Sequence, residues 1–208
     1  TVSSTGQNTP TVSQVQIKYV VNATPEIQNV IASQSESGTV AISYQARDSD
    51  TNSGTYNPGF VSSTFAYLDA EGAYQTIPSN ELTAGAMINQ PVATSTYTTS
   101  TLVWTPPAGL SVAASRIRVT INDNELANNT ASANSATFLL DSVSPVVSST
   151  NSVIVDASST PAFLTLSASD TSTMQMRISL NSDMSGSSWV AYATTSTISL
   201  ATDPDTVY

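Results

Sequence analysis

The sequence has no histidine and no cysteine, and only five lysines and arginines stand against fifteen aspartates and glutamates. The missing residue types exclude imidazole bases, Cys/His zinc centres, triads built on His or Cys, and disulfides. The net charge of −10 opposes binding to nucleic acid and to anionic membrane surfaces. No apolar run approaches the roughly 18 residues of a membrane helix. We therefore expect neither nucleic acid nor a membrane as partner.

Charged residues make up only 10% of the chain, whereas about 25% is typical of globular proteins. Serine and threonine fill the place of charged residues, with 65 of the 208 positions. The 39% of hydrophobic residues suffices for a core, so the chain is not a disordered Ser/Thr stalk. This composition predicts a secreted β-protein. Because the chain starts at Thr1 rather than at Met, we expect a processed chain or a segment of a longer one.

Alternating apolar segments recur every 10–20 residues between Gly, Pro, Asn, Asp and Ser, which is typical of antiparallel β-sandwiches. A first sandwich is predicted over 23–141, with strands at 27–32, 39–46, 60–68, 73–77, 96–104, 116–121 and 136–140 and loops at 81–94 and 122–135. A second is predicted over 142–208, with strands at 153–155, 162–169, 174–179, 189–192 and 197–200. Its roughly 60 residues of strand pattern fall short of the 90–100 of a seven-stranded sandwich. We expect it to lack its last strands unless a neighbouring copy completes it.

The first 22 residues carry an additional strand pattern ahead of the linker Asn22–Pro25. We expect this strand, 15–21, to complete an adjacent domain. Either the chain is one period of a longer repetitive protein, or separate subunits polymerise head to tail by β-strand addition. A third alternative is simple disorder at the termini. The residues expected at such an interface are Val15, Ile17, Tyr19, Val21, Val207 and Tyr208.

Several stretches resemble Ig-like and fibronectin type III-like repeats of large bacterial cell-surface proteins. The resemblance rests on Pro25–Val30, Gly38–Tyr44, Arg47–Asp50, Arg116–Asp123, Ala127–Ala131 and Phe138–Asp141, and then on Leu164–Asp170, Met176–Ser179, Trp189–Tyr192 and Thr206–Tyr208. It covers about 25–208 and implies two tandem Ig-like sandwiches in an extracellular module. Such folds host many roles, so the resemblance implies little about function.

Four carboxylates stand in two loops that an Ig-like sandwich places at one end, beside the linker: Asp48, Asp50, Asp123 and Glu125. Converging carboxylates repel one another unless a cation lies among them, and Ca²⁺ takes six to eight oxygen ligands. A calcium ion is therefore a candidate cofactor. The alternative is an ordinary solvated loop, where Asp is common. Paired carboxylates also occur in glycosidases, but these stand in loops without cleft aromatics, so we predict no enzyme activity.

Trp104 and Trp189 alternate within strands and are predicted core residues. Tyr56, Phe60, Tyr67 and Tyr74 either pack half-buried or line a binding face. The favoured function is structural: a subunit or repeat segment of a bacterial surface filament, stalk or surface layer, with other copies or adjacent repeats as partners. The alternative is an adhesin or carbohydrate-binding module that takes surface glycans.

Overall fold

The computed structural model describes residues 14–17, 21–51, 59–83, 89–148, 153–158 and 161–199. Within these ranges every regular element is a β-strand except one 3-10 turn, η1 (Ser79–Glu81), and all strand pairs are antiparallel. The predicted all-β, antiparallel class is therefore confirmed. In the same ranges, no helix has the length and apolarity needed to span a membrane.

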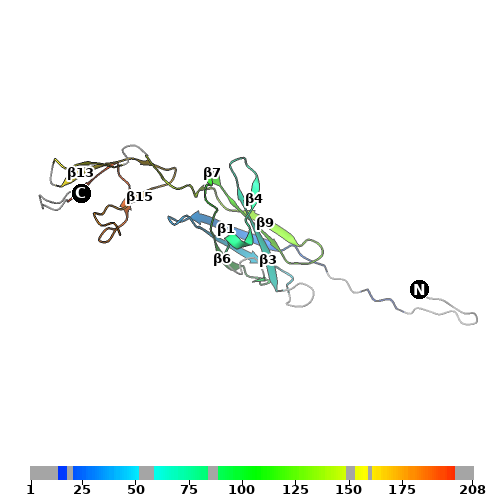
Figure 1. Ribbon diagram of the computed structural model, residues 1–208. Coiled ribbons are helices and arrows are strands. Elements are labelled where there is room, and N and C mark those ends of the chain that lie inside the picture. Colours follow the sequence, from blue (N-terminus) through cyan, green and yellow to red (C-terminus); the bar gives the residue numbers. More distant parts are fainter. Residues whose placement is uncertain are drawn as a thin grey trace, which may run out of the picture.

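A first group of strands, β1 to β10, forms two main sheets (Figure 1). One sheet has the order β1-β2-β6, with β1 at Glu26–Gln34, β2 at Val40–Arg47 and β6 at Thr98–Trp104. The other has the order β4-β3-β8-β9, with β4 at Tyr74–Thr76, β3 at Phe60–Leu68, β8 at Ile117–Asn122 and β9 at Thr130–Asn134. β5 (Gln90–Pro91) pairs with β3, and β7 (Ser111–Ser115) pairs with β10 (Phe138–Asp141).

The two sheets face each other because their strands alternate apolar and polar residues. In β2 the buried positions are Val40, Ile42, Tyr44 and Ala46, and in β8 they are Ile117, Val119 and Ile121, as the sequence pattern predicts. Trp104 is fully buried, as predicted, and stacks on Tyr67 with 5.1 Å between ring centroids. The Tyr44 ring meets Phe65 edge-on across the sheets. This packing forms one continuous core.

Apart from the two-residue β5, which falls inside the expected loop 81–94, two strands of the first group lie where the sequence pattern predicted none. β9 falls inside the expected loop 122–135, and β7 precedes the strand expected at 116. Both consist of Ser, Thr, Ala and Asn apart from Val112, so neither has a marked apolar alternation. β9 forms because β8 offers it a pairing edge from Arg118 to Asn122. The tertiary neighbour, not local propensity, determines this strand.

A second group of strands follows and forms three small sheets. The largest sheet contains β12 (Val153–Asp156), β13 (Ala162–Leu166) and β17 (Thr195–Ile198). The second sheet pairs β11 (Val146–Val147) with β14 (Ala168–Ser169). The third pairs β15 (Gln175–Met176) with β16 (Val190–Ala191). Among its described residues, Ala162 and Leu164 are the buried hydrophobic ones. Trp189 is 63% exposed, so its prediction as a core residue is wrong. The strands that surround it leave its ring uncovered.

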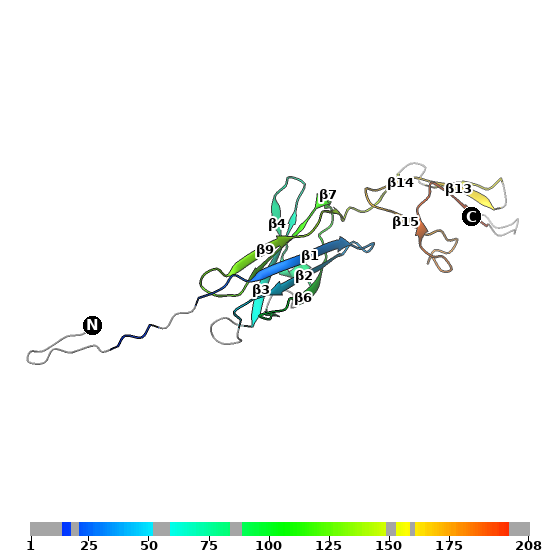
Figure 2. The ribbon, with the colours of Figure 1, turned by 180° about the vertical axis from the view of Figure 1, so that it is seen from behind.

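The two ends of the molecule differ in character (Figures 1 and 2). The second group lies at one end of the first group, and residues 14–17 extend from the opposite end in both views. Residues 14–17 and 21–25 belong to no strand. The surplus apolar segment and the second group are thus separated by the whole first group.

The buried hydrogen bond between Tyr44 and Ser63 tests the account of the core. The two hydroxyl oxygens lie 2.7 Å apart, and both residues are almost fully buried. We predict that Tyr44→Phe lowers the free energy of unfolding by about 1–2 kcal/mol, because it leaves Ser63 unsatisfied. Adding Ser63→Ala should recover part of that loss in urea unfolding. The control Tyr74→Phe removes an exposed bond to Asn134 and should cost less than about 0.5 kcal/mol. Equal losses for the two Phe variants would contradict this account.

Candidate functional site

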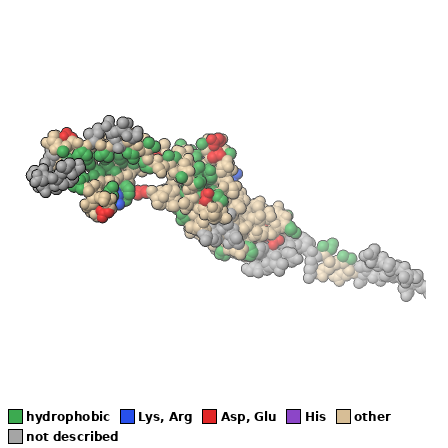
Figure 3. All heavy atoms as spheres, viewed as in Figure 1, with side chains coloured by type: hydrophobic (Ala, Val, Ile, Leu, Met, Phe, Trp, Pro, Cys, Tyr) green, Lys and Arg blue, Asp and Glu red, His purple; other side chains and the backbone are tan. Residues whose placement is uncertain are grey.

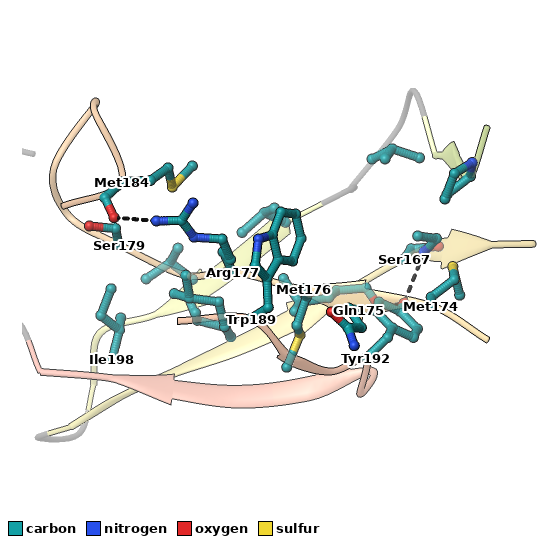
Figure 4. Close-up of a pocket in the computed structure, with 18 of the residues that line it drawn as sticks. Ser167, Met174, Gln175, Met176, Arg177, Ser179, Met184, Trp189, Tyr192 and Ile198 are labelled. Atoms are coloured by element: carbon teal, nitrogen blue, oxygen red, sulfur yellow. Dashed lines mark hydrogen bonds between the residues drawn. The ribbon is translucent and has the colours of Figure 1, made fainter. Parts of the chain in front are cut away.

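The largest sheet of the second group exposes an apolar face. The register pairs Val153 with Leu166 and Val155 with Leu164, so these four side chains share one face of the sheet. They line one side of a cleft of about 960 Å³. The same cleft is lined by Met174, Met176, Ile178 and Trp189, and Figure 4 shows Met174, Met176 and Trp189 in place. We call this surface the open face.

The open face is not covered by the strands that the structure describes. Val153 and Val155 are 55% and 51% exposed. Hydrophobic side chains gather over this part of the molecule in Figure 3. The Arg177 guanidinium lies 5.5 Å from the centre of the Trp189 ring and donates a 2.7 Å hydrogen bond to the Met184 carbonyl. These contacts hold the rim of the cleft and leave its apolar floor exposed, which is typical of a surface that binds a partner.

The residues predicted at the interface lie partly within the described ranges. Val15, Ile17 and Val21 are 75%, 78% and 70% exposed. Tyr19, Val207 and Tyr208 lie outside the described residues. Residues 14–17 and the second group of strands, which carries the open face, lie at opposite ends of the first group (Figures 1 and 2). An apolar segment and an apolar cleft are therefore available to different neighbours.

A second site lies where the linker 22–25 meets the loops that follow β2 and β8. Asp48 and Asp123 are both fully buried. The Asn22 Nδ2 donates to Asp123 Oδ2 at 2.8 Å, and the Ala23 backbone N–H donates to Asp50 Oδ2 at 2.8 Å. The structure thus brings Asp48, Asp50 and Asp123 together beside the linker. We call these residues, with Asn22, the carboxylate cluster.

Asp48 is the unusual member of the cluster. Both of its carboxylate oxygens are buried and lack a hydrogen-bond partner, and the Oδ1 of Asn22 shares that condition. Burial raises the pKa of Asp48 to about 7, and the neighbouring carboxylates of Asp50 and Asp123 add to the shift. The preceding residue does not neutralise it, because the Arg47 guanidinium pairs with Glu26 at 2.8 Å. A buried carboxylate in this condition is costly.

Glu125, the fourth predicted ligand, contributes its backbone to the turn after β8. Its N–H donates to Asp123 Oδ1 at 2.9 Å, and its carbonyl accepts from Asn129 Nδ2 at 2.8 Å. Asn22 was not predicted as a site residue, because an amide in a linker has no distinguishing pattern. Among the described residues, no three or more carboxylate side chains are already arranged to hold a metal ion. Any ion here would therefore need other oxygens as well.

No family model matches the chain, and no curated protein or solved structure shows significant similarity to it. The resemblance to Ig-like and fibronectin type III-like repeats stays a prediction. Function must therefore be argued from the open face, the N-terminal segment and the carboxylate cluster.

The pKa of Asp48 predicts a specific pH dependence of stability. Between the ordinary pKa of 3.8 and about 7, the unfolded chain has released a proton that the folded chain retains. The contribution of Asp48 to stability therefore falls as the pH rises from about 4 to about 7 and is flat above that. Asp48→Asn lacks this loss, so its stability relative to the wild type should rise with pH, from near zero at pH 4 to roughly 4 kcal/mol at pH 7.

The measurement is urea unfolding in buffer freed of divalent cations, at intervals from pH 4 to pH 8. The control is Glu71→Gln, which removes an exposed charge at the turn before β4 and should follow the wild type. A difference between Asp48→Asn and wild type that does not change with pH would contradict the assignment.

Proposed function

We propose that this chain is a structural extracellular protein, a subunit or repeat segment of a bacterial surface filament, stalk or surface layer. Its units are two tandem Ig-like sandwiches, and they join head to tail. The observation that carries the proposal is an open apolar face at one end together with the exposed apolar residues Val15, Ile17 and Val21 at the other. Segment 14–21 of one unit adds to the edge of the sheet β12-β13-β17 of the next and directs its apolar side chains toward the open face.

The dimensions of the two surfaces support this assembly. Four extended residues of the segment span about 13 Å at roughly 3.3 Å each, which is the length of a four-residue strand such as β12 or β17. Val15, Ile17 and Val21 are spaced by even numbers of residues, so an extended segment presents all three on one face. That face meets the apolar floor of the cleft. In the described sheet β12-β13-β17, the outer edges of β12 and β17 offer backbone groups for strand addition.

The geometry of the contact favours a chain of units over a closed dimer. The donor segment and the acceptor face are different surfaces, so the contact is heterologous. A heterologous contact between opposite ends of an elongated unit repeats without closing. The same contact serves whether the segment comes from a separate chain or from the next repeat of a longer one. The uncharged Ser/Thr-rich composition suits a spacer on the cell surface.

An adhesin that binds glycans through the aromatics of the first group has less support. Tyr67 stacks on the buried Trp104, and the Tyr74 ring is covered by the Arg118 guanidinium at 3.5 Å. Phe60 is half-buried in β3, and Tyr56 lies outside the described residues. The described members of this set therefore do not form a flat exposed platform.

Ile17→Asp tests the proposal on the full chain. A charge at this position would be buried against the apolar cleft, so we expect association between copies to weaken at least about tenfold. Gln16→Asp is the matched control, because it adds the same charge on the opposite face of the strand. Sedimentation velocity over a range of concentrations gives the association. The fluorescence emission of Trp189 reports whether the segment binds at the cleft, because it should shift to shorter wavelength when the cleft is filled.

A synthetic peptide of residues 11–22 extends the test to the repeat arrangement, in which free chains need not polymerise. The peptide should shift the Trp189 emission, and its Ile17→Asp form should not. The buried Trp104 contributes a constant background. If the wild type stays monomeric and neither peptide changes the emission, the proposal is wrong.

A further inference from the structure

The carboxylate cluster has the properties of a cation site rather than of a solvated loop. Asp48 is fully buried with both oxygens unpartnered, and Asn22 Oδ1 is buried and unpartnered beside it. While Asp48 is ionised, these three atoms are all acceptors, so no hydrogen bond between them can satisfy any of them. A solvated turn residue would instead point its carboxylate at water or at a backbone N–H, as Asp69 does toward Ala73. Neither carboxylate oxygen of Asp48 bonds to a cationic side chain of the described residues.

We propose that Asp48, Asp50, Asp123 and Asn22 bind one Ca²⁺ ion where the linker enters the first group of strands. Calcium accepts carboxylate, amide and backbone carbonyl oxygens in irregular sets of six to eight. That tolerance matters because carboxylates alone do not complete the site, and Asn22 adds a neutral oxygen from the linker. Mg²⁺ demands a near-ideal octahedron and retains its waters, which a buried site does not suit.

The chain offers no cation of its own to this site among the described residues. Arg47 directly precedes Asp48, but its guanidinium bonds to Glu26 and lies 4.8 Å from the centre of the Tyr97 ring. Alternation along β2 directs these two neighbours to opposite sides. The buried carboxylate of Asp48 is therefore open to an external ion.

The ion would act on the linker as well as on the loops. Asn22 and Ala23 already bond to Asp123 and Asp50, and Asn128 Nδ2 donates to the Asn22 carbonyl at 3.4 Å. Calcium would tie these contacts together and fix the direction in which segment 14–21 leaves the first group. The site lies within one chain, so it does not depend on the proposed assembly.

The test is calorimetric titration of the full chain with Ca²⁺ alone, paired with thermal melting in EGTA and in about 5 mM Ca²⁺. We expect one ion per chain, a Kd of about 10⁻⁵–10⁻³ M and a melting temperature raised by several degrees. Asp48→Asn should bind at least thirtyfold more weakly while melting higher than the wild type in EGTA at pH 8. That second result shows that the variant folds. Glu71→Gln should bind as the wild type does.

Two further variants separate the parts of the inference. Asn22→Ala should weaken Ca²⁺ binding about tenfold, and affinity equal to the wild type would overturn the role of the linker. Ile17→Asp should bind Ca²⁺ unchanged, because the site is distant from the assembly contact. No heat and no change in melting temperature for the wild type would overturn the site itself. Equal responses to Ca²⁺ and Mg²⁺ would overturn its selectivity.

Discussion

An antiparallel sheet with one apolar face must cover that face, and the two groups of strands meet this requirement differently. In the first group, the two sheets pack on each other around Trp104, Tyr44 and Phe65. In the second, Val153 and Val155 belong to a similar apolar row, but the described strands leave these two side chains about half exposed. The proposed head-to-tail assembly follows from this uncovered apolar face of the second group. Without it, the apolar segment at the other end would have no complementary surface.

The linker between segment 14–21 and the first group connects the two proposals. Assembly by strand addition needs a segment presented in one direction, because free rotation of the linker adds an entropic cost to every junction. The contacts of Asn22 and Ala23 with Asp123 and Asp50 reduce that freedom. An ion at Asp48 would reduce it further. Extracellular calcium would then control the stiffness of a rod whose joints are made by apolar packing.

The sequence predicted the elements whose alternation is marked, such as β2, β3 and β8, and the inward faces that they present. It missed β7 and β9, whose small polar residues form strands only against a partner. It placed Trp189 in a core, because alternation cannot tell whether a second layer exists. The meeting of Asp48, Asp50 and Asp123 followed from where sandwich loops lie. The burial of Asp48 and the place of Asn22 in the carboxylate cluster depend on how the linker packs against the loops. No local sequence pattern predicts that packing.

The most direct measurement is a density map of the assembled protein that resolves the path of residues 14–21. The account predicts that this segment pairs as an added strand along the outer edge of β12 or β17 of the neighbouring unit, with Ile17 directed toward the apolar cleft. A map in which the segment pairs within its own unit, or in which units are joined through other surfaces while the cleft stays open, would contradict it.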